Sequence, residues 1–151
     1  MGEFTDRTGE KHITNEGYEV EIIKYVNAFD CTIRFLKYGN VINNVRFEHV
    51  KAGRIKNPYH TAVHGVGYLG EGKYRAYRAS KIYKTWISML ERCYCEKSQV
   101  KHPTYIGCSV DESWHNFQNF GKWFEENYKE GHQLDKDILI KGNCVNIFLK
   151  I

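Results

Sequence analysis

The sequence has little proline and no long hydrophobic run, and both features narrow the class of protein. Only 2 of its 151 residues are proline. It also lacks serine-rich segments and runs of one charge, so the composition excludes a disordered chain. No stretch approaches the roughly 18 apolar residues that cross a bilayer, and residues 1–15 lack the apolar core of a signal peptide. We therefore expect a folded cytoplasmic protein with no membrane partner.

Cysteine is scarce and irregularly spaced. The chain has 5 cysteines, whereas disulfide-stabilised secreted domains favour an even number, so we expect reduced thiols. Cys93 and Cys95, with His102, Cys108 and His115, offer thiolate and imidazole ligands for zinc. Only one residue separates Cys93 from Cys95, whereas about two to four residues usually separate the two cysteines of a zinc knuckle. We therefore predict no metal site.

Sequence signatures of catalysis are absent as well. The chain has no Gly-x-Ser-x-Gly elbow, and no cysteine carries a local catalytic signature. Glycines crowd between residues 65 and 72. The Walker Lys-Ser/Thr ending and a strand-to-helix position are missing there, so this run predicts a hairpin turn rather than a phosphate loop. The sequence thus predicts no catalytic residue and no cofactor.

The sequence does contain enough apolar mass for a core, with 42% hydrophobic and 15% aromatic residues. Alternating hydrophobic residues predict strands over 18–25, 31–36 and 41–47, and tight turns join them into an antiparallel β-meander. In the third strand, Val41, Val45 and Phe47 are expected on one face. Segments 66–69 and 73–77 flank Gly70-Glu71-Gly72 and predict a hairpin.

The second half of the sequence has helical periodicity. After Ser80, a good N-cap residue, apolar residues follow helical spacing through Tyr94. A second helix is predicted over 116–128, with Phe117, Phe120, Phe124 and Tyr128 on one side. Residues 137–140 and 145–149 predict two strands across a turn at 141–143.

These elements predict an α+β fold. It consists of an N-terminal antiparallel β-meander plus hairpin, followed by a small two-helix aromatic-rich segment with a terminal β-hairpin. The predicted domains are a β-rich basic subdomain over 1–64 and a hairpin plus helical subdomain over 65–151.

The net charge of +4 is unevenly distributed. Residues 37–84 hold 10 Lys and Arg but only 2 Asp and Glu. Within them, residues 73–84 interleave basic residues with three tyrosines and contain no carboxylate. Lys and Arg neutralise phosphates and tyrosine stacks on bases, so this pattern favours nucleic-acid binding. The alternative is a solvated hairpin whose tyrosines cover the core. The predicted binding residues are Arg46, Lys51, Arg54, Lys56, Lys73, Arg75, Tyr77, Arg78, Lys81 and Lys84.

Residues 80–143 resemble a group of bacteriophage proteins. The motifs that carry the resemblance are Arg92-Cys93-Tyr94, Pro103-Thr104-Tyr105, Cys108-Ser109-Val110, Glu112-Ser113-Trp114, Asn116-Phe117-Gln118-Asn119-Phe120, Trp123 and Leu134-Asp135-Lys136-Asp137. These proteins are similar to HNH-type homing endonucleases and often carry AP2-like DNA-binding segments, which the basic β-meander resembles. The resemblance implies a phage origin, a location in the host bacterial cytoplasm and a role in handling nucleic acid.

The resemblance fails where an HNH nuclease has its catalytic residues. Such an enzyme needs a His general base and metal ligands on a strand and a following helix. Only Asp135 and Asn143 correspond to that motif, and Lys136 stands where a His is useful. The sequence ends at Ile151, before a ligand-bearing helix. We therefore expect a degenerate, truncated catalytic unit and no enzyme activity.

Three functions remain open at this point. The first is a non-catalytic, phage-type protein that binds DNA or RNA through its basic, tyrosine-rich face. The second is a phage-encoded inhibitor of a bacterial defence nuclease, of the anti-CRISPR kind, which binds the nucleic-acid-bound effector nuclease. The third is a metal-dependent HNH-like nuclease whose missing groups come from a partner subunit. Retention of the fold without its catalytic residues favours the first two.

Overall fold

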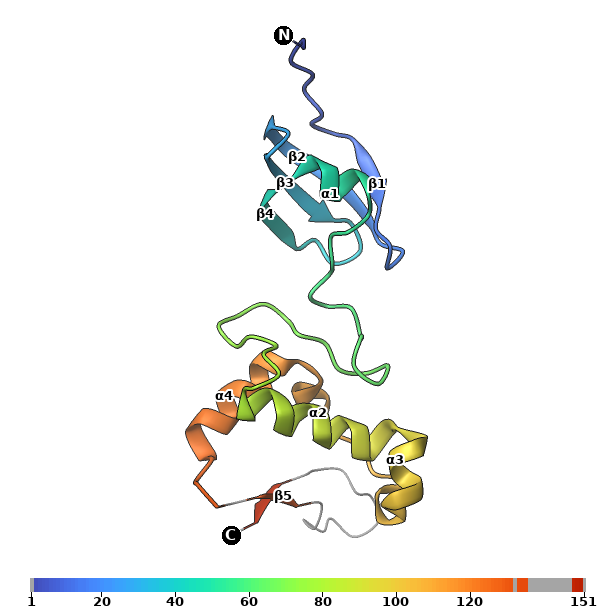
Figure 1. Cartoon of the computed structure of the whole chain (residues 1–151), viewed down its shortest axis with the longest axis vertical. Helices are drawn as coiled ribbons and strands as arrows, with labels where there is room; N and C mark the ends of the chain where they lie inside the picture. Colours follow the sequence, from blue (N-terminus) through green and yellow to red (C-terminus); the bar gives the residue numbers. More distant parts are fainter. Residues whose placement is uncertain (1, 132, 136–147, 151) are drawn as a thin grey trace. The chain divides into compact units, whose positions relative to one another are not determined.

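The computed structural model describes residues 2–131, 133–135 and 148–150. The chain divides into two compact units, Met1–His60 and Thr61–Ile151, each with its own buried hydrophobic cluster. A four-stranded antiparallel sheet occupies the first unit, and the second is mainly helical (Figure 1). The predicted α+β class is therefore confirmed. The sequence predicted the boundary after residue 64, whereas the two compact units divide after His60.

The sheet of the first unit is a meander of four strands. They are β1 (Lys11–Ile13), β2 (Glu19–Asn27), β3 (Asp30–Phe35) and β4 (Val41–Val45), paired in that order. The alternation that predicted β2 and β3 is confirmed, because Val20, Ile22, Cys31, Ile33 and Phe35 are all at most 1% exposed. The short edge strand β1 was not predicted, because three residues are too few to show a period and its one apolar residue, Ile13, is 63% exposed.

The structure corrects the third predicted strand, which was expected over residues 41–47 with Val41 and Val45 on one face. β4 ends at Val45, which is buried, whereas Val41 is 40% exposed. Asn44 has a left-handed φ of 56°, and the pairing of β3 with β4 shifts register beside it. A bulge of this kind reverses the alternation of side chains. Ile42 consequently packs against the core in place of Val41.

Phe47, which the sequence placed in that strand, instead begins α1 (Phe47–Lys51). The helix lies against the sheet (Figure 1), and its Val50 is 1% exposed in the same hydrophobic cluster as Phe35. A single helical turn has too few residues to show a 3.6-residue period, so the sequence did not reveal it.

Two longer helices build the second unit, α2 (Lys81–Tyr94) and α4 (Phe117–Asn127), and both were predicted. Ser80 caps α2 by accepting a hydrogen bond from the Tyr83 backbone N–H at 3.5 Å. Between them lie α3 (Glu96–Lys101), η1 (Pro103–Tyr105) and η2 (Glu112–His115). The predicted apolar faces form the core, whose buried residues are Trp86, Met89, Leu90, Cys93, Cys108, Val110, Phe117, Phe120 and Phe124.

The hairpin predicted over 66–69 and 73–77 does not form. Residues 69–80 have no strand structure, and Tyr68 instead makes an isolated parallel bridge with Asn116 at the start of α4. Gly67, Gly70 and Gly72 instead allow the segment to pack closely against side chains of α2, of α4 and of Asn116, which precedes α4. A methyl group at Gly67 would lie 2.5 Å from Leu90 Cδ1 and 3.0 Å from Trp86 Cζ2. The segment therefore passes directly over the helices, where larger residues would not fit.

Near the end of the chain, β5 (Gln133–Asp135) and β6 (Phe148–Lys150) pair antiparallel. Most of the predicted terminal hairpin, residues 137–140 and 145–149 with its turn, lies outside the described residues, as do Lys136 and Asn143. None of the helices that the structure describes has the length and apolar character to span a bilayer.

Candidate nucleic-acid interface

Four of the predicted binding residues belong to the first unit, and all four are exposed. Arg46 directly precedes α1, Lys51 is the last residue of α1, and Arg54 and Lys56 follow it. The turn between them depends on Gly53, whose φ is +70° and whose added Cβ would lie 2.7 Å from Asn15 Oδ1. Asn15 also donates its backbone N–H to the Gly53 carbonyl at 2.8 Å. The turn therefore fixes the backbone beside Lys51 and Arg54.

The charges of this group differ in their partners. Arg46 forms an ion pair with Glu48 at 3.4 Å, and its guanidinium lies 5.5 Å from the centroid of the Phe29 ring. Phe29 is 71% exposed, so a ring and a cation lie together at the surface. Lys51, Arg54 and Lys56 form no ion pair with any carboxylate in the described part of the chain. Their charge is available to an external anion.

A second aromatic and cationic cluster in this unit was missed by the sequence reasoning. The Lys37 amine lies 5.2 Å from the centroid of the Tyr38 ring, and Tyr38 is 45% exposed. Tyr38 packs beside Tyr18 and Tyr59, and the Tyr18 hydroxyl lies 2.8 Å from His60 Nδ1. The Lys37-Tyr38 pair in a turn was the only local signal, because the other members are distant in sequence.

In the second unit, Lys73 is compensated by a carboxylate. Its amine lies 2.8 Å from Glu125 Oε2, and Tyr74 donates its hydroxyl to the same oxygen at 2.6 Å. Hydrogen bonds from Lys73 and Tyr74 lower the pKa of Glu125, and the bond to Glu125 raises the pKa of Lys73. Because both groups are exposed to water, this pair contributes little to stability. Its charge is nevertheless less available to a phosphate than that of an unpaired lysine.

Lys81 is also engaged within the unit. Its amine donates a hydrogen bond to the Tyr128 hydroxyl and lies 4.4 Å from the centroid of that ring. Lys81 is the first residue of α2, and Tyr128 directly follows α4. The contact therefore joins the start of one helix to the end of the other.

The remaining four predicted residues are Arg75, Tyr77, Arg78 and Lys84, and all are exposed. Tyr77 is 66% exposed, and the three cations form no ion pair with a described carboxylate. The backbone turns here, since Tyr77 donates its N–H to the Arg75 carbonyl and Ser80 donates to Tyr77, both at 2.8 Å. The strand predicted over residues 73–77 is therefore wrong.

A glutamine and a glycine on α4 hold the segment that leads into these cations. Gln118 accepts a hydrogen bond from the Tyr74 backbone N–H at 3.0 Å and donates to the carbonyls of Leu69 and Tyr74, both at 2.9 Å. One turn further along, an added Cβ at Gly121 would lie 2.5 Å from the Tyr74 ring. Tyr74 thus packs directly on the helix. These anchors were missed, because nothing in the local sequence links Gln118 to residues 69–74.

Comparisons with models of protein families, with curated proteins and with solved structures found no match.

Within the described part of the chain, no three His, Cys, Asp or Glu side chains gather as a metal site requires. The residues first considered for zinc have structural contacts. Cys93 and Cys108 are buried in the core of the second unit. His115 Nε2 lies 3.1 Å from the Val110 carbonyl oxygen and 3.5 Å from the Tyr94 hydroxyl. Burial raises the pKa of the Tyr94 hydroxyl, so this hydroxyl is uncharged at neutral pH.

Proposed function

We propose that this chain is a non-catalytic nucleic-acid-binding protein that contacts the phosphate backbone through exposed cations in both units. One observation carries the proposal: apart from Lys81, which Tyr128 engages, six of the ten predicted binding residues are exposed cations that no described carboxylate pairs with. These uncompensated cations are Lys51, Arg54, Lys56, Arg75, Arg78 and Lys84. A cation already paired with a carboxylate must lose that partner to bind phosphate, whereas an uncompensated one only releases counterions from the nucleic acid.

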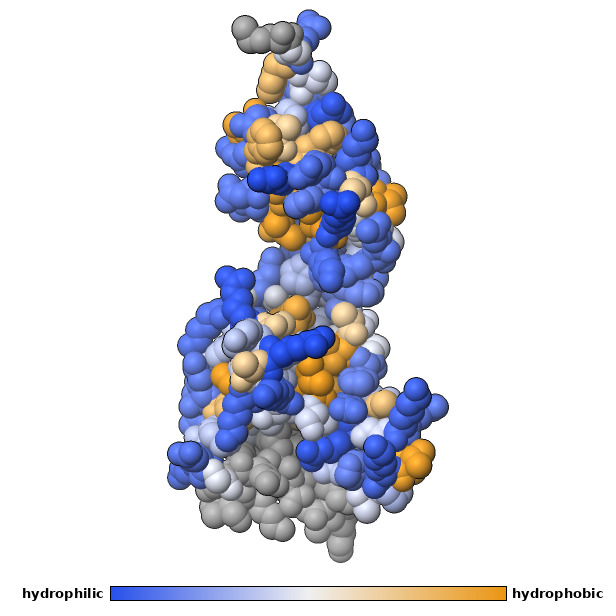
Figure 2. Space-filling view, viewed as in Figure 1, coloured by the Kyte–Doolittle hydropathy of each residue, from blue (hydrophilic) through white to orange (hydrophobic). Residues whose placement is uncertain are grey.

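Exposed aromatic rings beside the cations support the same function. Tyr77 lies between Arg75 and Arg78 in the chain, and Phe29 contacts Arg46. Figure 2 shows hydrophobic residues exposed among hydrophilic ones on both units. Aromatic rings next to cations suit unpaired bases, which stack on the rings while their phosphates contact Lys or Arg. This combination favours single-stranded segments over a regular duplex.

The test measures binding and cleavage in one set of reactions. The full chain is titrated with labelled single-stranded and duplex DNA and RNA at several salt concentrations, with magnesium, manganese or zinc present. We expect affinity to fall linearly with salt on a log–log plot and the nucleic acid to remain intact. Metal-dependent cleavage lost in an Asp135→Ala variant would establish the HNH-like nuclease instead. Tight binding to a bacterial effector nuclease, without binding of free nucleic acid, would establish the inhibitor.

Replacing Tyr77 separates base stacking from phosphate contact. We expect Tyr77→Ala to weaken binding of single-stranded nucleic acid by about 1–3 kcal/mol, because a stacked base loses its aromatic partner. Duplex binding should change little, since paired bases are not available to stack. Tyr77→Phe keeps the ring and should bind as the native protein does. Equal losses in Tyr77→Ala and Tyr77→Phe would show that the hydroxyl, not the ring, makes the contact.

A further inference from the structure

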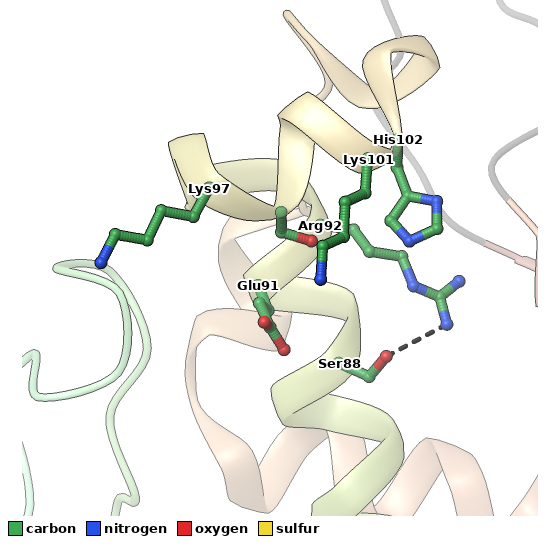
Figure 3. A pocket seen from close by; sticks show the side chains of 7 residues that line it. Ser88, Glu91, Arg92, Lys97, Lys101 and His102 are labelled. Carbon is green, nitrogen blue, oxygen red and sulfur yellow. Dashed lines mark hydrogen bonds between the residues drawn. The ribbon is translucent and has the colours of Figure 1, made fainter.

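A hollow in the second unit gathers positive charge away from the ten predicted binding residues. It has a volume of about 530 Å³ and lies where α3 follows the C-terminal half of α2 (Figure 3). Its lining residues are Ser88, Glu91, Arg92, Lys97, Ser98, Lys101 and His102. Figure 3 shows the Arg92 guanidinium and the Lys101 amine directed into the same space, while Lys97 extends away from it.

Arg92 is held in place by neutral groups. Its Nη2 donates to Ser88 Oγ at 3.0 Å, and its Nη1 donates to the Tyr105 hydroxyl at 3.3 Å. The guanidinium also lies 5.7 Å from the centroid of the Tyr105 ring. These partners orient the group without neutralising it, and a guanidinium has five N–H donors. Arg92 therefore presents unused donors in a fixed position, which lowers the entropy lost when an anion binds.

The charge of the hollow matches a doubly charged anion. Arg92 and Lys101 direct two positive charges into the hollow, and Lys97 and Glu91, which also line it, carry opposite charges, so the lining totals +2 with His102 counted as neutral. In the described part of the chain, none of these three cations forms an ion pair. A phosphate monoester carries about −1.5 to −2 at pH 7, whereas a backbone phosphodiester carries a single charge. Planar guanidinium groups suit phosphate oxygens particularly well.

We infer that this hollow binds a phosphate monoester, with Arg92 and Lys101 as its principal contacts. Ser88 and Ser98 add hydroxyl donors at the same site. The volume falls within the roughly 300–1,000 Å³ of small-molecule sites, so it also admits part of the group that carries the phosphate. Two sources supply this chemistry, a free nucleotide and the phosphorylated 5′ end of a nucleic acid. The inference does not rest on the proposed function, because a free nucleotide alone can demonstrate the site.

The test compares adenosine 5′-monophosphate with adenosine, using the full chain and amide chemical shifts in NMR. We expect the monophosphate to bind, with shifts centred on residues 97–102, and adenosine to bind at least about tenfold more weakly. Arg92→Gln should weaken monophosphate binding by about tenfold or more, because it removes charge-assisted hydrogen bonds. Lys101 is exposed, so Lys101→Gln should retain the fold and weaken binding by about threefold.

Lys129→Gln is the matched control, since it removes one exposed lysine from outside the hollow. Equal binding of monophosphate and adenosine, or an equal loss in the Lys101→Gln and Lys129→Gln variants, would overturn the inference. Paired single-stranded oligonucleotides, one 5′-phosphorylated and one 5′-hydroxyl, then distinguish the sources. A preference for the phosphorylated strand that Lys101→Gln removes assigns a nucleic-acid 5′ end. Binding of the monophosphate without that preference assigns a free nucleotide.

Discussion

Replacing three uncompensated cations in either unit should weaken nucleic-acid binding about a hundredfold. The first variant combines Lys51→Gln, Arg54→Gln and Lys56→Gln, and the second combines Arg75→Gln, Arg78→Gln and Lys84→Gln. At about 1 kcal/mol for each lost phosphate contact, three changes give roughly this factor. The slope of log K against log salt should flatten by about 2 to 3, at about 0.7–0.9 per contact. Filter binding at four or more salt concentrations measures both quantities.

The chain offers a control with the same change in charge. Lys11, Arg34 and Lys73 pair with Glu19, Glu21 and Glu125, respectively. Replacing all three by Gln lowers the formal net charge as much as either variant above but removes only compensated cations. We expect this control to retain most of the affinity and the slope. A loss as large as that of the two test variants would mean that net charge, and not the proposed surface, governs binding.

Trp86→Ala should strongly destabilise the second unit. Trp86 is fully buried, its ring centroid lies 5.0 Å from that of Phe117, and its indole N–H donates to the Trp114 carbonyl at 2.7 Å. Removing a buried Trp costs about 3–5 kcal/mol of unfolding free energy. In a unit of this size, that lowers the melting temperature by more than about 10 °C. All three tryptophans belong to the second unit, so fluorescence of Trp114 and Trp123 reports its unfolding.

Phe35→Ala is the complementary change in the first unit. Phe35 is fully buried in the sheet core, and the two hydrophobic clusters share no residue. We expect Phe35→Ala to lower the stability of the sheet, as seen by circular dichroism, and to leave the tryptophan transition in place. A tryptophan transition that moves equally in both variants would show that the two cores unfold as one cooperative unit.

The features that the sequence predicted are those encoded by neighbouring residues. Strand β3 could be recognised because Cys31, Ile33 and Phe35 alternate, and α4 because Phe117, Phe120 and Phe124 share one helical face. The path of residues 66–77 could not, since a glycine-rich segment has the same local pattern in a hairpin and in a loop packed on helices. What decides between them is the contact of Tyr74 with Gln118, 44 residues away.

The candidate interface was predictable to the same extent. Composition located the basic residues, and the structure places all ten at exposed positions. Their partners were hidden, because Lys73 meets Glu125 across 52 residues and Lys81 meets Tyr128 across 47. Glu125 compensates the charge of Lys73, and this pairing depends on tertiary packing. The hollow beside α2 and α3 had no local signal either, since the sequence predicted no helix over residues 96–101.

Residues 75–79 are fastened at both ends, by Gln118 and Gly121 at Tyr74 and by the N-cap of α2 at Ser80. Their exposed side chains have no part in either attachment. The sequence of residues 75–79 can therefore vary without changing the contacts that attach the segment to α2 and α4. We expect the fold to tolerate five-residue sequences of other composition between Tyr74 and Ser80, whereas substitutions at Gln118, Gly121 or Ser80 would disturb the attachment of the segment.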